Sequence, residues 1–127
     1  MVSKFPELEG LAVTVDRVLY VPHLRKSSVD AHPFVYYITI HNHSGHVVTV
    51  YGRKWVVTSE NGEMVVVEGD GVVGKTPRLE SGESFSYNSS HSVMCNSVAE
   101  GSYLCVTEEQ ERVVARIPPF RMDLPVA

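Results

Sequence analysis

The chain of 127 residues has the length of one domain, and its 43% hydrophobic and 20% charged content excludes a disordered protein. Its net charge is −4 and its lysines and arginines are not clustered, so we expect no nucleic-acid-binding surface. No apolar run is long enough for a membrane span or a signal-peptide core, which predicts a cytoplasmic protein without membrane insertion.

Alternation of apolar and polar residues, the period of a β-strand, begins near the N-terminus in LAVTVDRVLYV, residues 11–21. It recurs in FVYYITIH, residues 34–41, where every second residue from Phe34 onward falls on one apolar face. A third strand is predicted over residues 47–58, with a bulge where Gly52 interrupts the pattern.

The pair Asn61-Gly62 is a strong hairpin signal, because both residues tolerate the positive φ of a type I′ turn. It predicts that the strand before it pairs antiparallel with the strand EMVVV after it. Three more alternating stretches follow, ESFSYNSS at 83–90, SYLCVT at 102–107 and RVVARI at 112–117. Pro118-Pro119 is expected to end the last of them.

About seven short strands without an amphipathic helix between them predict an all-β fold, an immunoglobulin- or fibronectin-III-like β-sandwich of antiparallel strands. Tyr103 lies two residues before Cys105, where such domains place a tyrosine whose hydroxyl ties back the preceding loop; the alternative is an ordinary half-buried aromatic residue. Trp55 precedes both cysteines, which excludes the antibody order, and is expected in the core. Without a C-x-x-C pair, Cys95 and Cys105 are expected to be free thiols.

Several short motifs occur together in this chain, and their combination is more specific than any one of them. They are ITIHN at 38–42, Arg53-x-Trp55, the Asn61-Gly62 hairpin, V-x-G-x-G-V-V-G at 67–74, SGESFSY at 81–87, GSY at 101–103 and IPPF at 117–120. The sequence thus resembles the ApaG family over about residues 34–120. The resemblance implies one domain over residues 1–127 with an immunoglobulin/fibronectin-III-like fold. Because related domains are fused to eukaryotic F-box and polymerase-delta-interacting proteins, it also implies a portable module that recruits proteins.

The stretch GDGVVGKTP, residues 69–77, matches both the G-x-G-x-x-G and the G-x-x-x-x-G-K-T phosphate-binding patterns. The residues of this candidate site are Gly69, Gly71, Gly74, Lys75 and Thr76. Both patterns need a following helix, whereas Pro77 and strand-like residues come next, and Glu68 and Asp70 add negative charge. We therefore expect a structural or partner-contacting loop, with pyrophosphate or a nucleotide as the alternative ligand.

A second candidate site is the H-x-H-x-x-H pattern at His41, His43 and His46. The first two histidines share a strand face and permit a divalent cation between them, although no carboxylate lies within the triplet. The acidic turn TEEQER, residues 107–112, is interpreted as a solvated hairpin tip.

These observations favour a non-enzymatic protein-interaction module without a cofactor, which binds a protein partner or forms a homodimer. The alternative is a small-ligand sensor that binds a phosphate compound or a divalent cation and influences cobalt or magnesium efflux, an activity with which the family has been associated.

Overall fold

The computed structural model describes residues 4–25 and 31–125, and nearly all of them belong to strands or tight turns. The elements in chain order are β1 (Leu11–Tyr20), the 3-10 helix η1 (Pro22–Leu24), β2 (His32–Asn42), β3 (Val48–Ser59), β4 (Met64–Asp70), β5 (Arg78–Leu79), β6 (Ser84–Val93), β7 (Ser97–Thr107) and β8 (Arg112–Met122). The predicted all-β fold is confirmed. The eighth strand, absent from the prediction of about seven, is the two-residue β5.

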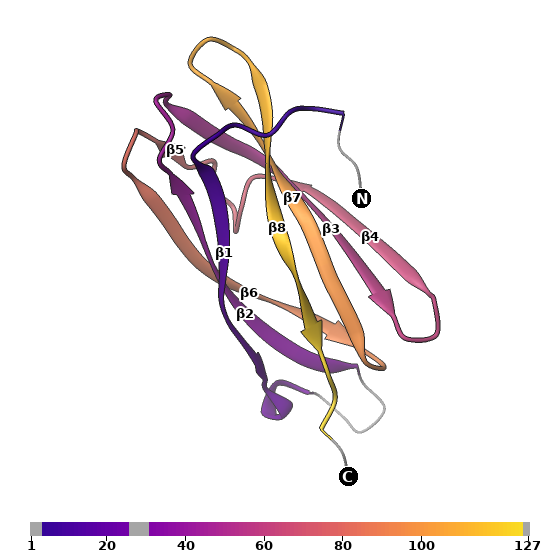
Figure 1. Ribbon diagram of the computed structural model, residues 1–127. Helices are drawn as coiled ribbons and strands as arrows, with labels where there is room; N and C mark the ends of the chain where they lie inside the picture. The colour runs from indigo at the N-terminus through magenta and orange to yellow at the C-terminus, as the bar shows by residue number, and fades with distance from the viewer. Residues whose placement is uncertain (1–3, 26–30, 126–127) are drawn as a thin grey trace.

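Two antiparallel sheets form the sandwich (Figure 1). One sheet has the order β1-β2-β6, and the other has the order β4-β3-β7-β8 with β5 paired to β3. On one side of the sandwich β1 lies beside β8, whereas β4 and β6 form the edges on the other side. The two outer strands of the larger sheet therefore have different surroundings.

The core is built from the inward faces predicted by alternation. In β2 the side chains of Phe34, Tyr36, Ile38 and Ile40 are buried, while the intervening Tyr37 is exposed. Trp55 of β3, only 2% exposed, packs on the Tyr36 ring at a centroid distance of 5.0 Å. The prediction that Trp55 belongs to the core is confirmed.

The strand pairing of the larger sheet has two irregularities. The pairing of β3 with β7 shifts between Val50 and Gly52, which confirms the predicted bulge. The prediction that Pro118-Pro119 ends the last strand is wrong, since β8 continues to Met122. These prolines are tolerated because β8 is an edge strand and its pairing with β7 shifts at this point.

The hairpin at Asn61-Gly62 is confirmed, but its turn type differs from the prediction. Only Gly62 has a positive φ, of 91°, so the turn is not type I′. The Gly62 N–H donates to the Ser59 carbonyl, and the Ser59 N–H donates to the Glu63 carbonyl. This pattern belongs to a three-residue loop with a left-handed third residue. The Asn61 side chain accepts a hydrogen bond from the Glu63 N–H, which explains its place in the turn.

Within the described ranges, no helix is long and apolar enough to cross a membrane. Cys95 and Cys105 are free thiols, as predicted.

Candidate functional site

The glycine loop, residues 69–76, connects β4 to β5, and no helix follows it. The Val72 N–H donates to the Lys75 carbonyl at 2.7 Å, and the Lys75 N–H donates back to the Val72 carbonyl at 2.9 Å. Between them, Val73 and Gly74 have φ values of 45° and 78°. The tip of the loop is therefore a two-residue turn of the type I′ class, and its centre is closed by its own hydrogen bonds.

Gly69 and Gly71 leave room for other parts of this protein. A Cβ on Gly69 would lie 2.6 Å from Nη2 of Arg53, whose Nη1 donates to the carbonyls of Asp70 and Gly71. A Cβ on Gly71 would lie 2.4 Å from the Lys75 carbonyl oxygen. The Gly71 N–H donates to the Tyr51 carbonyl at 2.7 Å. Packing within the protein thus accounts for Gly69 and Gly71, whereas Gly74 has a positive φ and no neighbour within 4 Å of a Cβ. Lys75 and Thr76 are exposed beside them.

His41 and His43 lie together, with stacked rings 5.8 Å apart. The two ring nitrogens of His41 contact the hydroxyls of Thr14 at 2.9 Å and Ser84 at 3.3 Å. His46 does not join this pair. The structure therefore does not assemble the predicted histidine triplet into one site.

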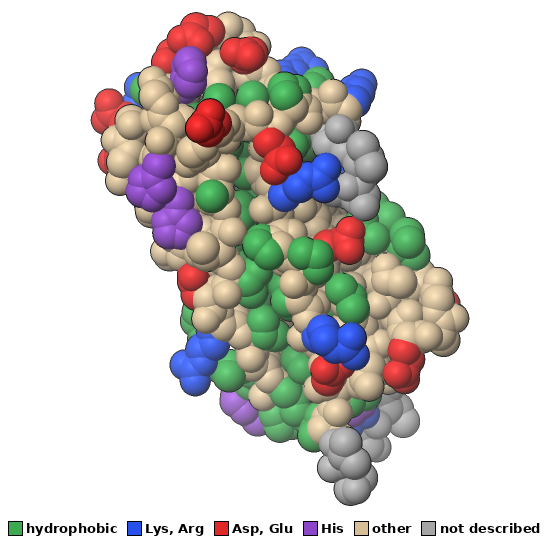
Figure 2. Space-filling model, viewed as in Figure 1, with side chains coloured by type: hydrophobic (Ala, Val, Ile, Leu, Met, Phe, Trp, Pro, Cys, Tyr) green, Lys and Arg blue, Asp and Glu red, His purple; other side chains and the backbone are tan. Residues whose placement is uncertain are grey.

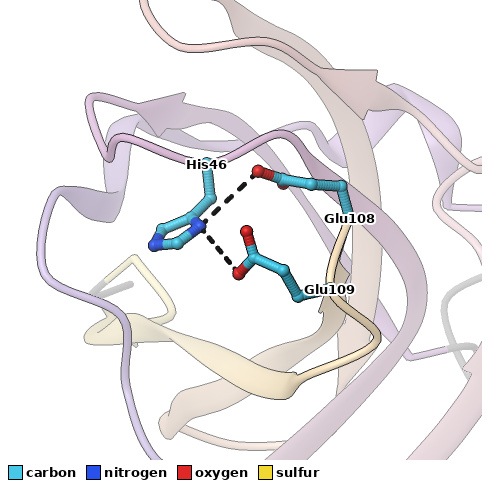
Figure 3. A group of neighbouring side chains, drawn as sticks. All are labelled: His46, Glu108 and Glu109. Atoms are coloured by element: carbon cyan, nitrogen blue, oxygen red, sulfur yellow. Dashed lines mark ion pairs between the residues drawn. The ribbon is translucent and has the colours of Figure 1, made fainter.

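His46 instead faces Glu108 and Glu109 of the turn between β7 and β8 (Figure 3). Its Nδ1 lies 3.6 Å from Glu108 Oε1 and 3.3 Å from Glu109 Oε2. The Glu108 backbone N–H, and to a smaller extent Val47 and His46, lower the pKa of the Glu108 carboxyl. The turn is a solvated hairpin tip as predicted, since Glu108, Glu109 and Glu111 are exposed, and two of its carboxylates are in addition neighbours of His46. Figure 2 shows histidine and acidic side chains near one another at the upper end of the molecule.

The histidine loop, residues 42–47, is held by the buried side chain of Asn42. Its Nδ2 donates to the carbonyls of His46 at 2.8 Å and Leu79 at 2.9 Å. Its Oδ1 accepts from the Ser44 N–H and hydroxyl. The His46 N–H in turn donates to the Ser44 Oγ. These bonds fix the backbone on both sides of the His46 side chain.

The centre of the sandwich holds polar atoms among aromatic rings. His91 stacks on Tyr36 and meets Trp55 edge-on at 4.7 Å, and burial lowers its pKa to about 4. The hydroxyl of the buried Tyr103 contacts that of Tyr87 on the opposite sheet. Tyr103 is therefore a structural residue as predicted, but its hydroxyl links the two sheets instead of tying back a loop.

Strand β4 exposes apolar side chains on both of its faces. The fractional exposures are 63% for Met64, 57% for Val65, 52% for Val66 and 41% for Val67. β4 pairs with β3, and among the described strands nothing pairs with its outer side. The sequence signal was the run Val65–Val67, which breaks the alternation expected of a half-buried strand.

A hollow of about 950 Å³ lies beside β4, between the N-terminal segment and the outer face of the sheet. Its lining includes Phe5, Tyr51, Lys54, Glu68, Gly69 and Leu104. Lys54 and Glu68 form an ion pair of 3.5 Å across its wall. The hollow therefore continues the exposed β4 surface with both apolar and charged groups.

Comparison with known proteins agrees with this architecture. The chain is 39% identical to Protein ApaG of Vibrio cholerae over 93 residues, covering 72% of this chain and 74% of that protein. It is 35% identical to Protein ApaG of Vibrio vulnificus over 107 residues, covering 84% and 85%. The crystal structure of the putative ApaA protein from Bordetella pertussis superposes with a TM-score of 0.83 at 30% identity, covering 96% and 99%. The ApaG domain model matches residues 22–107, and the chain belongs to the ApaG family.

Proposed function

We propose that this protein is a non-enzymatic interaction module of the cytoplasm that binds an extended segment of a partner protein along the outer edge of β4. The observation that carries the proposal is the exposure of Met64 and Val65–Val67 on an edge strand. Soluble proteins normally protect such edges with charge, proline or a covering segment. An apolar edge left open is suited to pairing with another strand.

Strand addition would use both the backbone and the side chains of β4. The unpaired N–H and C=O groups supply affinity, and the alternating side chains supply specificity. By its register with β3, Val65 lies opposite Val57 and Val67 opposite Trp55, on the inward side, while Met64 and Val66 face outward. An incoming strand would therefore meet apolar side chains on both of its faces.

Charges around the valines indicate the chemistry of the partner. Glu63 precedes β4, and Glu68 and Asp70 occupy its other end, so carboxylates flank the apolar run. Opposite charges at the rim favour encounter and fix the register of pairing. The expected partner segment is apolar at its centre and carries lysine or arginine near its ends.

Other groups of the molecule favour binding over catalysis. Burial raises the pKa of the Cys105 thiol to about 12, the opposite of what activates a nucleophilic cysteine. In the glycine loop, the N–H groups of Gly71, Val72 and Lys75 donate to carbonyls of the protein, which disfavours a phosphate ligand there.

The test compares capture from a lysate of the source organism by three proteins, namely the wild type, Val66→Lys and Tyr37→Lys. Tyr37 is an exposed aromatic residue on the other sheet, so its variant is a matched control. A partner retained by wild type and Tyr37→Lys but lost by Val66→Lys is expected, and mapping its bound segment should reveal an apolar strand flanked by basic residues. Equal capture by all three proteins would refute the proposal.

The oligomeric state separates a partner from a second copy of this chain. Light scattering of the purified wild type is expected to give a monomer whose β4 is open. A dimer that Val66→Lys converts to a monomer would mean that β4 pairs with another copy, and would overturn the assignment of a basic partner segment. Thermal denaturation of both variants checks that the substitutions leave the fold intact.

A further inference from the structure

We infer that His46, Glu108 and Glu109 form a binding site for a divalent ion of the zinc class. The candidate ligand atoms are the His46 Nδ1 and one carboxylate oxygen from each glutamate, all within 4.8 Å of one another. They come from two loops that are distant in sequence and meet at one end of the sandwich (Figure 3). The inference is independent of the β4 edge.

The distances fit a shared metal ion better than a direct ion pair. Charge-assisted N–H···O bonds are about 2.7–2.9 Å long. The Nδ1 of His46 is 3.6 Å from Glu108 Oε1 and 3.3 Å from Glu109 Oε2. A tetrahedral ion with bonds of about 2.0–2.2 Å holds its ligand atoms about 3.3–3.6 Å apart. The two distances from Nδ1 thus already match the spacing that a bound ion would require.

The surroundings of the His46 Nδ1 provide a second, separate observation. This atom is shielded from solvent and makes no hydrogen bond within the described part of the chain. Two carboxylates that face one ring nitrogen favour a positive charge between the three groups. A metal ion supplies that charge while it uses the lone pair of Nδ1.

The backbone around the ligands is fixed before any ion binds. The His46 carbonyl accepts a hydrogen bond from Asn42, and the His46 N–H donates one to Ser44. The Glu108 N–H donates to the Val47 carbonyl at 3.1 Å. In the opposite turn, the Gln110 N–H donates to the Thr107 carbonyl at 3.0 Å. Binding therefore has to order mainly the three side chains, which lowers its entropic cost.

The donor set selects the class of ion. One imidazole nitrogen and two carboxylates suit Zn²⁺ and neighbouring transition metals, whereas Mg²⁺ prefers oxygen ligands alone. The side chains of His46, Glu108 and Glu109 are 35%, 42% and 58% exposed. Three protein ligands at the surface leave further coordination positions to water, as in exchangeable rather than structural sites.

The experiment titrates Zn²⁺ into the full chain, with a phosphine reductant that keeps the cysteines reduced, and follows backbone amides and histidine ring protons by NMR. We expect a saturable one-to-one change centred on His46, Glu108 and Glu109, and none with Mg²⁺ at the same concentration. His46→Ala and Glu109→Gln should each weaken Zn²⁺ binding about tenfold or more.

Two matched control variants test where the ion binds. His43→Ala removes a nearby exposed histidine and Glu111→Gln removes an exposed carboxylate of the same turn, and both should bind Zn²⁺ as the wild type does. Changes centred on His41 and His43 or on Cys95 would overturn the assignment. Unchanged Zn²⁺ binding by His46→Ala would also overturn it. A titration that does not saturate at millimolar Zn²⁺ would overturn it as well, and would mean that the cluster is a simple ion pair. Unaltered amide spectra outside the two loops show that each variant is folded.

Discussion

The glycine loop and the histidine loop both connect strands of the sandwich, but they are stabilised in opposite ways. The glycine loop closes on its own backbone, since Val72 and Lys75 exchange two hydrogen bonds around a tight turn. The histidine loop is held by one buried side chain, that of Asn42, which leaves the His46 imidazole free to face another hairpin. A loop that satisfies its own donors has few left for a ligand, whereas a loop fixed by a buried residue can present its side chains outward.

The largest effect is expected from breaking the histidine loop with Asn42→Ala. The change leaves carbonyls and donors of His46, Leu79 and Ser44 without their partner in a buried place. We expect a loss of about 3 kcal/mol in the free energy of unfolding, measured by urea denaturation. Asn88→Ala, at an exposed position of β6, should cost far less. Equal losses would mean that Asn42 does not hold the loop.

Breaking the glycine loop with Gly71→Ala should cost about 2 kcal/mol. The new Cβ meets the Lys75 carbonyl oxygen, and φ at this position is 63°. Gly74→Ala is the matched control, because its φ of 78° is similar but its Cβ would have nothing within 4 Å. It should cost about 1 kcal/mol, from backbone strain alone. The difference between the urea midpoints of the two variants measures the cost of the contact with the Lys75 carbonyl oxygen. Equal midpoints would mean that this contact costs nothing.

Acid should destabilise the protein in part through His91 in the core. Its pKa is lowered to about 4 by burial, from an ordinary value of 6.5, so the unfolded chain takes up the proton first. Stability is therefore complete above about pH 6.5 and declines as the pH falls toward 4. His91→Gln should flatten this decline, followed by the fluorescence of the adjacent Trp55 during thermal unfolding. His43→Ala should leave it unchanged, and an equal flattening in both variants would contradict the assignment.

The smallest effect is expected from a substitution that relieves backbone strain in the glycine loop. Val73 has a φ of 45°, a conformation that is unfavourable for a β-branched residue. Val73→Asn should raise the free energy of unfolding by about 1 kcal/mol, because asparagine suits the first position of such a turn. Val73→Thr keeps the β-branch and should not differ from the wild type by thermal denaturation. A stabilised threonine variant would mean that backbone strain is not the cause.

The fold could be predicted because alternation is a local property of the sequence. Strand β2 buries every second residue from Phe34 to Ile40, and Gly52 correctly marked the bulge of β3. Position within a sheet is not local, which is why Pro118-Pro119 was expected to end a strand that continues along an edge.

The candidate sites depended still more on contacts between distant segments. The glycine motif matched two patterns, although the physical reason for Gly69 is the guanidinium of Arg53 on the neighbouring strand. The histidine spacing suggested a triplet, whereas the partners of His46 are Glu108 and Glu109 in another hairpin. No spacing rule within one stretch could bring these groups together.

The open edge of β4 also bears on how the protein behaves at high concentration. An apolar strand edge is a template for pairing between molecules, and Met64 and Val65–Val67 offer one on which no described strand lies. The carboxylates of Glu63 and Asp70 beside it are expected to oppose such pairing through mutual repulsion of like-charged molecules. Solubility of the isolated protein should therefore fall as salt screens these charges, and a bound partner should restore it.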